Sequence, residues 1–336
     1  MSKLEHIPKV SIITVYYNRA YCVKDSIQSL LNQTYDDFEL LLVDDGSKDT
    51  TLEEFNRLSD PRIKIVTHEN MGFTNSIKKA VDMARGKYIA IHGSGDYSYP
   101  TRIEKLVSFL DNNSGYNIVA PRFERFDEET LEKIEESQFS GDIDYNDFIY
   151  NCRIMHGAVM YRKSDYIKLG GYEPFFKVTQ DWDLFLRFVK LGKGRIIDDV
   201  LYRQYKRGDG AMANPKKFRD LLKLVALRIK LAKNTDKRGD ILKKVYEEGL
   251  EAVVTEKDYN YQNVYINRLS KLVKMGDYKM FLNYRKEFEL SSLSVKLKLR
   301  YYFWLYIAKL FKVSNMDKSK LLKVYSKLNY IKSKFS

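Results

Sequence analysis

Residues 38–47 read FELLLVDDGS, a short apolar run followed by two aspartates, a glycine and a serine. An apolar run of this length is typical of a strand that is buried on both faces of a parallel sheet. The run stops at Asp44-Asp45-Gly46-Ser47, which are residues that favour turns. Ligands of open parallel sheets bind beyond the carboxyl ends of the strands, so this point is a candidate binding site.

The same pattern repeats on both sides of this stretch. Short apolar runs predict further strands at residues 9–15, 63–66 and 88–91, and helical spacing predicts helices at 24–33, 50–58 and 74–84. Beyond them, we expect a loop and a helix in the acidic segment 127–150, a strand at 156–162 and a helix at 181–191. Strands and helices that alternate with short links indicate an α/β fold with a mostly parallel sheet.

Three polar clusters follow predicted strands. They are Tyr16-Tyr17-Asn18-Arg19, Asp44-Asp45-Gly46-Ser47 and Gly93-Ser94-Gly95-Asp96. Each cluster alone is ordinary turn chemistry. Three of them at successive strand ends favour a ligand site at one edge of the sheet.

An ordered set of motifs extends over about residues 8–210. It comprises SIITVYYN at 11–18, SLLNQTY at 29–35, VDDGSKDT at 43–50, NMGFT at 70–74, ARGKYIA at 84–90, GGY at 170–172 and QDWDL at 180–184 with Arg187. This set resembles family 2 of the nucleotide-sugar glycosyltransferases. The resemblance implies a GT-A fold, in which a Rossmann-like, mostly parallel sheet binds the nucleotide.

The resemblance also implies a nucleotide-sugar donor, with a UDP- or dTDP-sugar favoured. Asp45 is expected to bond the base, and Tyr17 to pack beside it. The other residues assigned to nucleotide-sugar binding are Val15, Asn18, Lys78, Ser94 and Asp96.

The metal motif of the family is altered in this chain. The family's Asp-x-Asp-Asp aligns with Gly93-Ser94-Gly95-Asp96, so glycines replace both usual carboxylates. Two alternatives remain. Asp96 holds Mg²⁺ or Mn²⁺ with help from the donor diphosphate, or no metal is needed because turn N–H groups and cations neutralise the phosphates. The candidate cations are Lys78 and the residues of the expected diphosphate lid, Arg203, Lys206 and Arg207.

The acceptor side follows from the same resemblance. Inverting transfer needs a carboxylate that takes the proton of the acceptor hydroxyl, and the resemblance assigns this role to Asp181. Asp183 is expected to brace the helix start or the loop of the base. His156 and Trp182 are candidate acceptor contacts, although His156 as a core histidine and Trp182 as a packing residue are the alternatives.

The charge divides the 336-residue chain into two parts. Residues 1–215 hold 29 basic and 33 acidic residues, whereas residues 216–336 hold 29 and 12 and contain no proline. We therefore expect a GT-A domain at 1–215 and a basic α-helical domain at 216–336. Its positive field fits anionic lipid head groups, a pyrophosphate-linked lipid acceptor or an anionic polysaccharide. The aromatic and basic segment 293–313 predicts either a membrane-surface helix or a partly buried helix.

Several classes of protein are excluded or disfavoured. Two cysteines without a CxxC pair argue against a disulfide scaffold and a zinc finger. No apolar run reaches the roughly 18 residues of a membrane span, and the first ten residues lack a signal-peptide core. We expect a cytoplasmic protein, free or peripheral on the inner face of the membrane. No nucleic-acid partner is expected, because no recognised nucleic-acid module is present.

These inferences combine into one hypothesis. The chain is expected to be an inverting glycosyltransferase that acts on a carbohydrate or lipid-linked glycan in surface polysaccharide synthesis. The alternative is a degenerate GT-A fold that serves as a non-catalytic nucleotide- or glycan-binding module.

Overall fold

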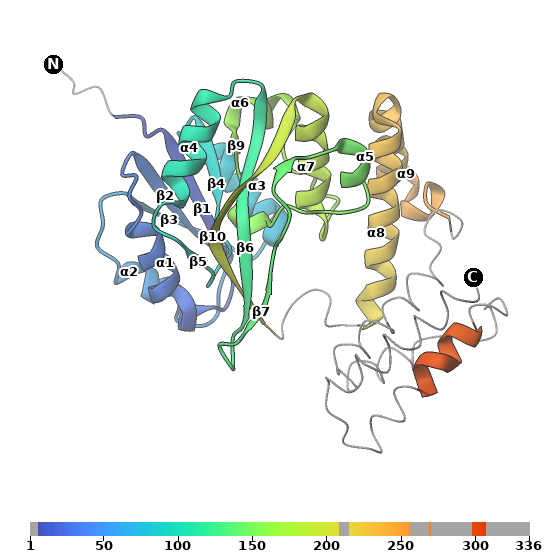
Figure 1. Ribbon diagram of the computed structural model, residues 1–336, viewed down its shortest axis with the longest axis horizontal. Helices are drawn as coiled ribbons and strands as arrows, with labels where there is room; N and C mark the ends of the chain where they lie inside the picture. Colours follow the sequence, from blue (N-terminus) through green and yellow to red (C-terminus); the bar gives the residue numbers. More distant parts are fainter. Residues whose placement is uncertain (1–5, 208–214, 256–268, 270–297, 307–336) are drawn as a thin grey trace. The chain divides into compact units, whose positions relative to one another are not determined.

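The computed structural model describes residues 6–207, 215–255, 269 and 298–306 (Figure 1). The chain divides into two compact units between Gly208 and Asp209.

A single sheet forms the centre of the first unit. The described residues contribute ten strands to it, in the order β3-β2-β1-β4-β9-β6-β10-β5, with β7 paired to β6 and β8 to β10. The strands are β1 (Val10–Tyr16), β2 (Phe38–Asp44), β3 (Ile63–Thr67), β4 (Tyr88–Ile91), β5 (Tyr97–Ser98), β6 (Tyr116–Asp127), β7 (Lys133–Glu136), β8 (Gly141–Asp142), β9 (Met160–Arg162) and β10 (Lys193–Lys206).

The direction of the strands determines where the loops meet. β3, β2, β1 and β4 are parallel, and β9 runs antiparallel between β4 and β6. β10 runs parallel to β6, so it has the same direction as β1. The carboxyl ends of β1, β2, β4, β6 and β10 therefore lie at one edge of the sheet.

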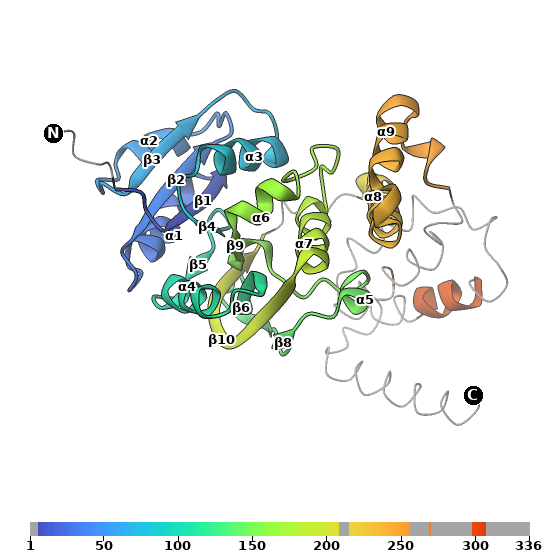
Figure 2. The same ribbon diagram turned by 90° about the horizontal axis from the view of Figure 1, so that it is seen from above.

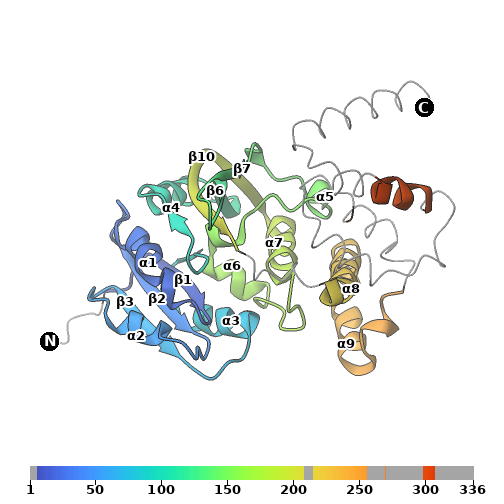
Figure 3. The ribbon, with the colours of Figure 1, turned by 90° about the horizontal axis from the view of Figure 1, so that it is seen from below.

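Helices cover both faces of the sheet. α1 (Val23–Leu31) and α4 (Arg102–Asn112) lie on one face, and α3 (Phe73–Met83), α6 (Lys163–Lys168) and α7 (Gln180–Leu191) lie on the other (Figure 2; Figure 3). The first unit also contains α2 (Thr51–Asn56), α5 (Tyr145–Phe148) and the 3₁₀ turns η1 (Ala20–Cys22) and η2 (His156–Ala158). Every residue of β1, β2 and β4 is buried, as expected for strands that are covered on both faces. On the α1 side, Ile12 and Leu40 belong to the same core cluster as Leu30 and Leu106.

The predicted α/β class and GT-A type of sheet are confirmed, but some elements differ from the sequence prediction. β6 and β10 were not predicted, because Pro121 and the pair Asp198-Asp199 interrupt their apolar patterns. The segment expected to be a strand at 156–162 begins as η2, and only Met160–Arg162 forms β9. Gly157 permits the close approach of η2 to the loop after β4 and to β10, because a Cβ there would lie 2.8 Å from the Gly93 nitrogen and even closer to the Tyr202 hydroxyl.

The second unit is helical where it is described. It contains α8 (Pro215–Lys233), η4 (Thr235–Lys237), α9 (Arg238–Glu248) and η5 (Leu250–Ala252), and residues 298–306 are also helical. The helix break expected near Gly239 occurs just before it. The breaks expected near Asn260, Gly276 and Ser314 lie outside the described residues. No helix in the described ranges combines the length and apolarity that crossing a bilayer requires.

Candidate active site

Five strand ends bring their loops to the same edge of the sheet. Tyr17–Arg19 follow β1, Asp45 follows β2, and His92–Asp96 follow β4. Glu128 follows β6, and Arg207 follows β10. The three polar clusters predicted from the sequence thus share one edge, which is the usual ligand position in this class of sheet.

Asp45 is a buried carboxylate at the end of β2, with 3% of its surface exposed. Its Oδ1 accepts a hydrogen bond from the Met71 N–H at 2.9 Å, and its Oδ2 accepts one from Asn70 Nδ2 at 3.3 Å. Its own N–H donates to the Tyr16 carbonyl at 2.9 Å, which joins the ends of β1 and β2. The loop after β3 therefore fixes the carboxylate that was predicted to bond the base.

Tyr17 and Asn18 lie in the loop next to Asp45. Asn18 adopts a left-handed conformation with φ of 52°, which asparagine tolerates better than most residues. Its Oδ1 accepts from the Lys48 N–H at 2.7 Å, so it connects the loops after β1 and β2. Tyr17 is 45% exposed, and its ring is accessible to a ligand, whereas Val15 is buried in β1. Their contacts with a nucleotide remain predictions.

His68 was not predicted as a site residue. Its side chain is only 7% exposed, and its Nδ1 lies 3.6 Å from Asp45 Oδ1. Its buried Nε2 has no hydrogen-bond partner among the described residues. No motif marked His68, because only the fold places the end of β3 against β2.

Asp96 ends the Gly93–Asp96 turn, and both oxygens of its carboxylate accept bonds from the protein. Its Oδ2 accepts from the Tyr202 hydroxyl at 2.7 Å, and its Oδ1 accepts from the Tyr205 N–H at 3.2 Å and from Arg207 Nη1 at 3.3 Å. Burial raises the pKa of Asp96, and these bonds oppose the rise. The carboxylate thus binds β10 to the turn.

The N–H groups of the turn are also engaged. The Gly93 N–H donates to the Tyr202 hydroxyl at 2.9 Å, and the Gly95 N–H donates to the Tyr16 hydroxyl at 3.3 Å. The structure therefore does not support the expectation that these two N–H groups bind phosphate.

The three residues of the expected lid have different surroundings. Arg207 lies at the turn, where its Nη2 donates to the Gly95 carbonyl at 2.7 Å and its Nε donates to Glu128 at 2.8 Å. Arg203 is instead bonded to Glu124 and the Tyr99 hydroxyl, at 2.9 and 2.7 Å. Lys206 is exposed. Of these three cations, only Arg207 contacts the turn.

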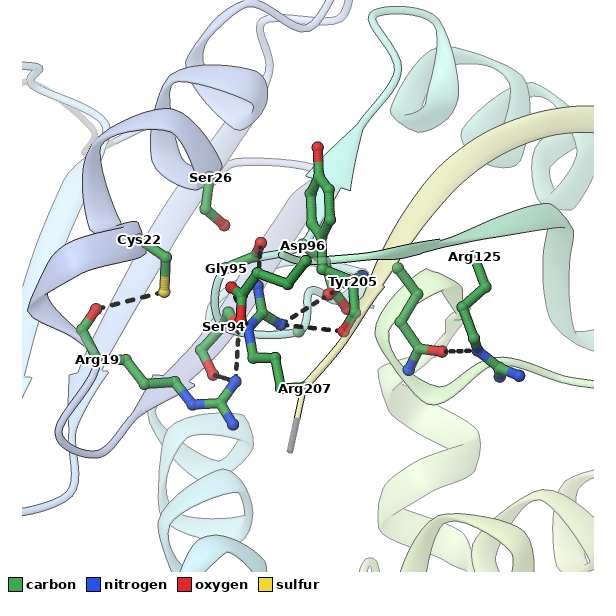
Figure 4. Close-up of polar contacts among 12 residues, drawn as sticks. Arg19, Cys22, Ser26, Ser94, Gly95, Asp96, Arg125, Tyr205 and Arg207 are labelled. Carbon is green, nitrogen blue, oxygen red and sulfur yellow. Dashed lines mark hydrogen bonds and ion pairs between the residues drawn. The ribbon is translucent and has the colours of Figure 1, made fainter. Parts of the chain in front are cut away.

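Two further arginines approach the turn. Arg19 belongs to the first polar cluster but was given no role of its own, and Arg102 was not predicted as a site residue. Arg19 Nη1 donates to the Ser94 carbonyl at 3.0 Å and contacts the Ser94 hydroxyl at 3.4 Å (Figure 4). Arg102 is wholly buried below the turn and donates to the Gly157 carbonyl at 2.8 Å. Its Nε and Nη2 have no partner among the described residues. Burial lowers the pKa of Arg102 to about 10, so it stays protonated at neutral pH.

Lys78 is on α3, where its ammonium group lies 3.2 Å from Asp82 one turn further along the helix. No described contact connects it to the Gly93–Asp96 turn. Its assignment to the diphosphate remains a prediction without structural support.

A divalent cation does not fit the residues of the turn. Mg²⁺ and Mn²⁺ need oxygen ligands with free lone pairs and negative charge. Asp96 directs both oxygens to protein donors, one of which is a guanidinium group. Among the described residues, no group of three or more His, Cys, Asp or Glu is arranged to hold a metal ion.

Asp181 lies in the first turn of α7 and is partly exposed. Its Oδ1 accepts from the Trp182 N–H at 2.8 Å, which is its one hydrogen bond within the described ranges. Thr179 precedes the helix in a left-handed conformation with φ of 63°, which is unusual for a β-branched residue. A strained residue thus begins the helix that carries the predicted base.

Asp183 holds this helix in place, in agreement with the role expected for it. Its side chain is 2% exposed and pairs with Arg187, whose Nη2 lies 2.9 Å from Asp183 Oδ2. Arg187 also donates to the carbonyls of Leu169 and Gly171 at 2.7 and 2.8 Å. The Gly-Gly-Tyr segment and the start of α7 are therefore joined by one guanidinium group.

His156 and Trp182 both have structural partners. His156 Nε2 lies 2.9 Å from the Tyr172 hydroxyl, and its ring packs against Phe73 and Phe185. Burial lowers the pKa of His156, and the nearby charge of Asp181 partly opposes this. Trp182 donates its indole N–H to the Phe148 carbonyl at 2.7 Å. These contacts favour the core and packing alternatives, and contact of either residue with an acceptor stays a prediction.

Comparison with known proteins identifies the family. Residues 11–170 match the family described as Glycosyl transferase family 2. The putative glycosyltransferase EpsE of Bacillus subtilis is 32% identical over 215 residues, which cover 60% of this chain and 74% of that protein. The chain belongs to glycosyltransferase family 2, and the predicted family and enzyme class are confirmed.

Other relatives are longer. Chondroitin synthase of Pasteurella multocida is 27% identical over 215 residues, covering 62% of this chain and 22% of that protein. An uncharacterized glycosyltransferase of Haemophilus influenzae is 34% identical over 157 residues, which cover 45% of this chain and 49% of that protein. The chain therefore spans about half or less of the length of these two relatives.

Solved structures support the fold. TarS 1-349 of S. aureus, described as a complex with UDP-GlcNAc, has a TM-score of 0.56 and 17% identity, and the match covers 90% of this chain and 91% of that chain.

Proposed function

We propose that this chain is an inverting glycosyltransferase that moves a sugar from a UDP- or dTDP-sugar to a hydroxyl group of a carbohydrate or lipid-linked glycan. The observation that carries the proposal is the Asp181 carboxylate. It is accessible, it lies at the start of a braced helix, and within the described ranges it accepts one hydrogen bond. A general base needs such an uncommitted oxygen to receive a proton.

The proposed reaction has one displacement step. The acceptor hydroxyl gives its proton to Asp181, and its oxygen forms a bond to the anomeric carbon. The bond between that carbon and the diphosphate oxygen breaks, and its electron pair leaves with the nucleoside diphosphate. Attack from the face opposite the diphosphate inverts the anomeric centre.

The donor class is supported by two independent observations. TarS, which has the same fold, is described in complex with UDP-GlcNAc. In this chain, Asp45 and the accessible Tyr17 ring lie at adjacent strand ends, where a base could be bonded on its edge and packed on its face.

The acceptor class is supported by a relative and by charge. The similarity to a chondroitin synthase favours polysaccharide synthesis. The excess of 29 basic over 12 acidic residues in 216–336 favours an anionic glycan or a pyrophosphate-linked lipid.

A peripheral position at an anionic membrane surface is part of the same proposal. Within the described helical segment 298–306, Leu299, Tyr302, Phe303 and Tyr306 are exposed, whereas Tyr301 and Trp304 are buried. The exposed residues follow helical spacing and form one apolar face, as in helices that lie at a membrane interface.

A donor panel tests the function. The protein is incubated with UDP-, dTDP- and GDP-sugars and an oligosaccharide acceptor, and released nucleoside diphosphate is measured. We expect turnover with one UDP- or dTDP-sugar and an inverted anomeric configuration in the product. Nucleotide binding without turnover on any acceptor would instead favour the non-catalytic binding module.

Vesicle sedimentation tests the membrane position. Wild-type protein should sediment with vesicles that contain phosphatidylglycerol, and the double variant Tyr302→Ser/Phe303→Ser should remain in the supernatant. Tyr246→Ser is the matched control, because Tyr246 is similarly exposed on α9. Equal sedimentation of the double variant and the control would contradict the proposal.

A further inference from the structure

Positive charge is concentrated at the Gly93–Asp96 turn. Arg19 and Arg207 each donate to a carbonyl of this turn, and Arg102 is buried behind it, beside Tyr202. Asp96 and Glu128 are carboxylates that the described contacts pair with Arg207. Burial makes the charge of Arg207 act more strongly than it would in water.

Arg207 is pre-positioned rather than mobile. Its side chain is 8% exposed, and its bonds to Glu128, Asp96 and the Gly95 carbonyl fix the plane of the guanidinium group. Its Nη1 also donates to the Tyr205 carbonyl at 3.4 Å, so the described contacts leave one Nη2 hydrogen to reach a phosphate oxygen. Figure 4 shows Arg207 pointing into the turn from the end of β10.

Arg19 approaches the same turn from the loop after β1. Its Nη1 contacts Ser94 through both the carbonyl and the hydroxyl oxygen. Arg19 and Arg207 thus arrive from two different strand ends and meet at adjacent residues, Ser94 and Gly95.

Arg102 supplies charge from inside the fold. It is wholly buried, the described residues form no direct ion pair with it, and its Nη1 donates to the carbonyls of Ile91 and Gly157. Its guanidinium carbon lies 5.3 Å from the centre of the Tyr202 ring, and the nearby charge of Asp96 favours its protonated form. An anion bound at the turn would further offset the cost of burying this cation.

We propose that the turn holds the diphosphate of the donor through Arg19 and Arg207, with Arg102 behind them, and without a divalent cation. This inference rests on the proposed nucleotide-sugar function. The same guanidinium groups stabilise the negative charge that develops on the leaving diphosphate. Arg207 forms an ion pair with Asp96, whose carboxylate is the one that remains in the altered metal motif.

Nucleotide binding measured by calorimetry tests the proposal without relying on turnover. UDP and dTDP are titrated into the full chain in EDTA and again with Mn²⁺, and UMP is the probe that lacks the second phosphate. We expect the affinity for the bound diphosphate to agree within about twofold between the two buffers. Arg207→Gln and Arg19→Gln should each weaken diphosphate binding about tenfold or more, because each loses a charge-assisted contact. They should weaken UMP binding less.

Arg62→Gln is the matched control. Arg62 precedes β3, at the edge of the sheet opposite the site, where it is paired with Asp60. This variant should bind the nucleotide like the wild type. Arg19→Gln keeps the test valid if Arg207→Gln does not fold, because Arg19 is only partly buried.

The outcomes distinguish this inference from the function on which it rests. Diphosphate binding that appears only with Mn²⁺, or unchanged affinity in both arginine variants, overturns the arginine site and leaves the transferase proposal standing. Absence of binding for UDP, dTDP and UMP in both buffers overturns the proposed function and the inference with it.

Discussion

Asp96 and Asp181 are two aspartates of the same candidate site with opposite surroundings. Asp96 is buried and accepts bonds from Tyr202, Tyr205 and Arg207, whereas Asp181 is accessible and, in the part of the chain that the structure describes, accepts one bond, from Trp182. A carboxylate whose two oxygens both accept bonds from the protein stabilises structure, and a carboxylate with a free oxygen can receive a proton. The difference shows that Asp96 has a structural role, and it supports our proposal that Asp181 is the base.

The largest expected effect is on catalysis. Asp181→Asn should reduce kcat by about 100- to 10,000-fold, because the amide cannot take the acceptor proton. The melting temperature and nucleotide affinity should stay near wild type, since Asp181 makes few contacts. Asp165→Asn is the matched control, because Asp165 is also in the first turn of a helix, α6, outside the site. Equal kcat in both variants would contradict the assignment of the base.

The next expected effect is on stability. Asp96→Asn should lower the free energy of unfolding by about 3 kcal/mol, because it removes the charge that faces the buried Arg207. Chemical denaturation measures this difference. If Asp96 were a metal ligand instead, the variant would keep its stability in EDTA and lose a stabilisation that Mn²⁺ gives to the wild type.

Below the turn, His92 predicts a pH dependence of stability. Burial, and the nearby charge of Arg102, hold the pKa of His92 well below its ordinary value of 6.5. Below about pH 6.5, His92 binds a proton in the unfolded chain but stays neutral in the folded chain. The free energy of unfolding therefore falls as the pH drops below this value. In the His92→Gln variant, the free energy of unfolding should decrease less steeply with falling pH, by up to about 1.4 kcal/mol per pH unit.

Urea unfolding at about pH 7.5 and about pH 5.5 measures this slope. Asn112→Gln is the control, because Asn112 is exposed and does not titrate, so the slope of this variant should match that of the wild type. A His92→Gln slope that also matches the wild type would show that His92 titrates normally in the folded protein.

The smallest expected effect concerns the start of the helix that carries Asp181. Thr179→Gly should raise the free energy of unfolding by about 1 kcal/mol, because glycine adopts a positive φ without the steric cost of a side chain. Thr101→Gly is the matched control. Thr101 is the N-cap of α4 with φ of −92°, so glycine there should destabilise the protein. A loss of stability in both variants would contradict the strain at Thr179.

The parallel core and its three polar clusters could be predicted from the sequence, because each strand and its loop form a local pattern. β6 and β10 could not, since their pairing joins distant segments and their apolar patterns are interrupted. Arg207 illustrates the consequence. It was one of several candidate cations, and only the path of β10 brings it to Asp96, 111 residues away in the chain.

Buried polar residues of the site could not be predicted from the sequence either. Arg102 occupies the first helical position of α4, where a sequence pattern predicts an exposed side chain. The fold instead encloses it below the turn. His68 likewise carries no local signal, because its burial depends on the loop that packs against Asp45.

The most direct test is turnover of the selected nucleotide sugar by protein dialysed against EDTA, compared with the same protein supplied with Mn²⁺. If arginines hold the diphosphate and Asp181 takes the proton, the two rates should agree within about twofold. Turnover that is absent in EDTA and restored by Mn²⁺ would contradict the account, because Asp96 would then have to act as a metal ligand.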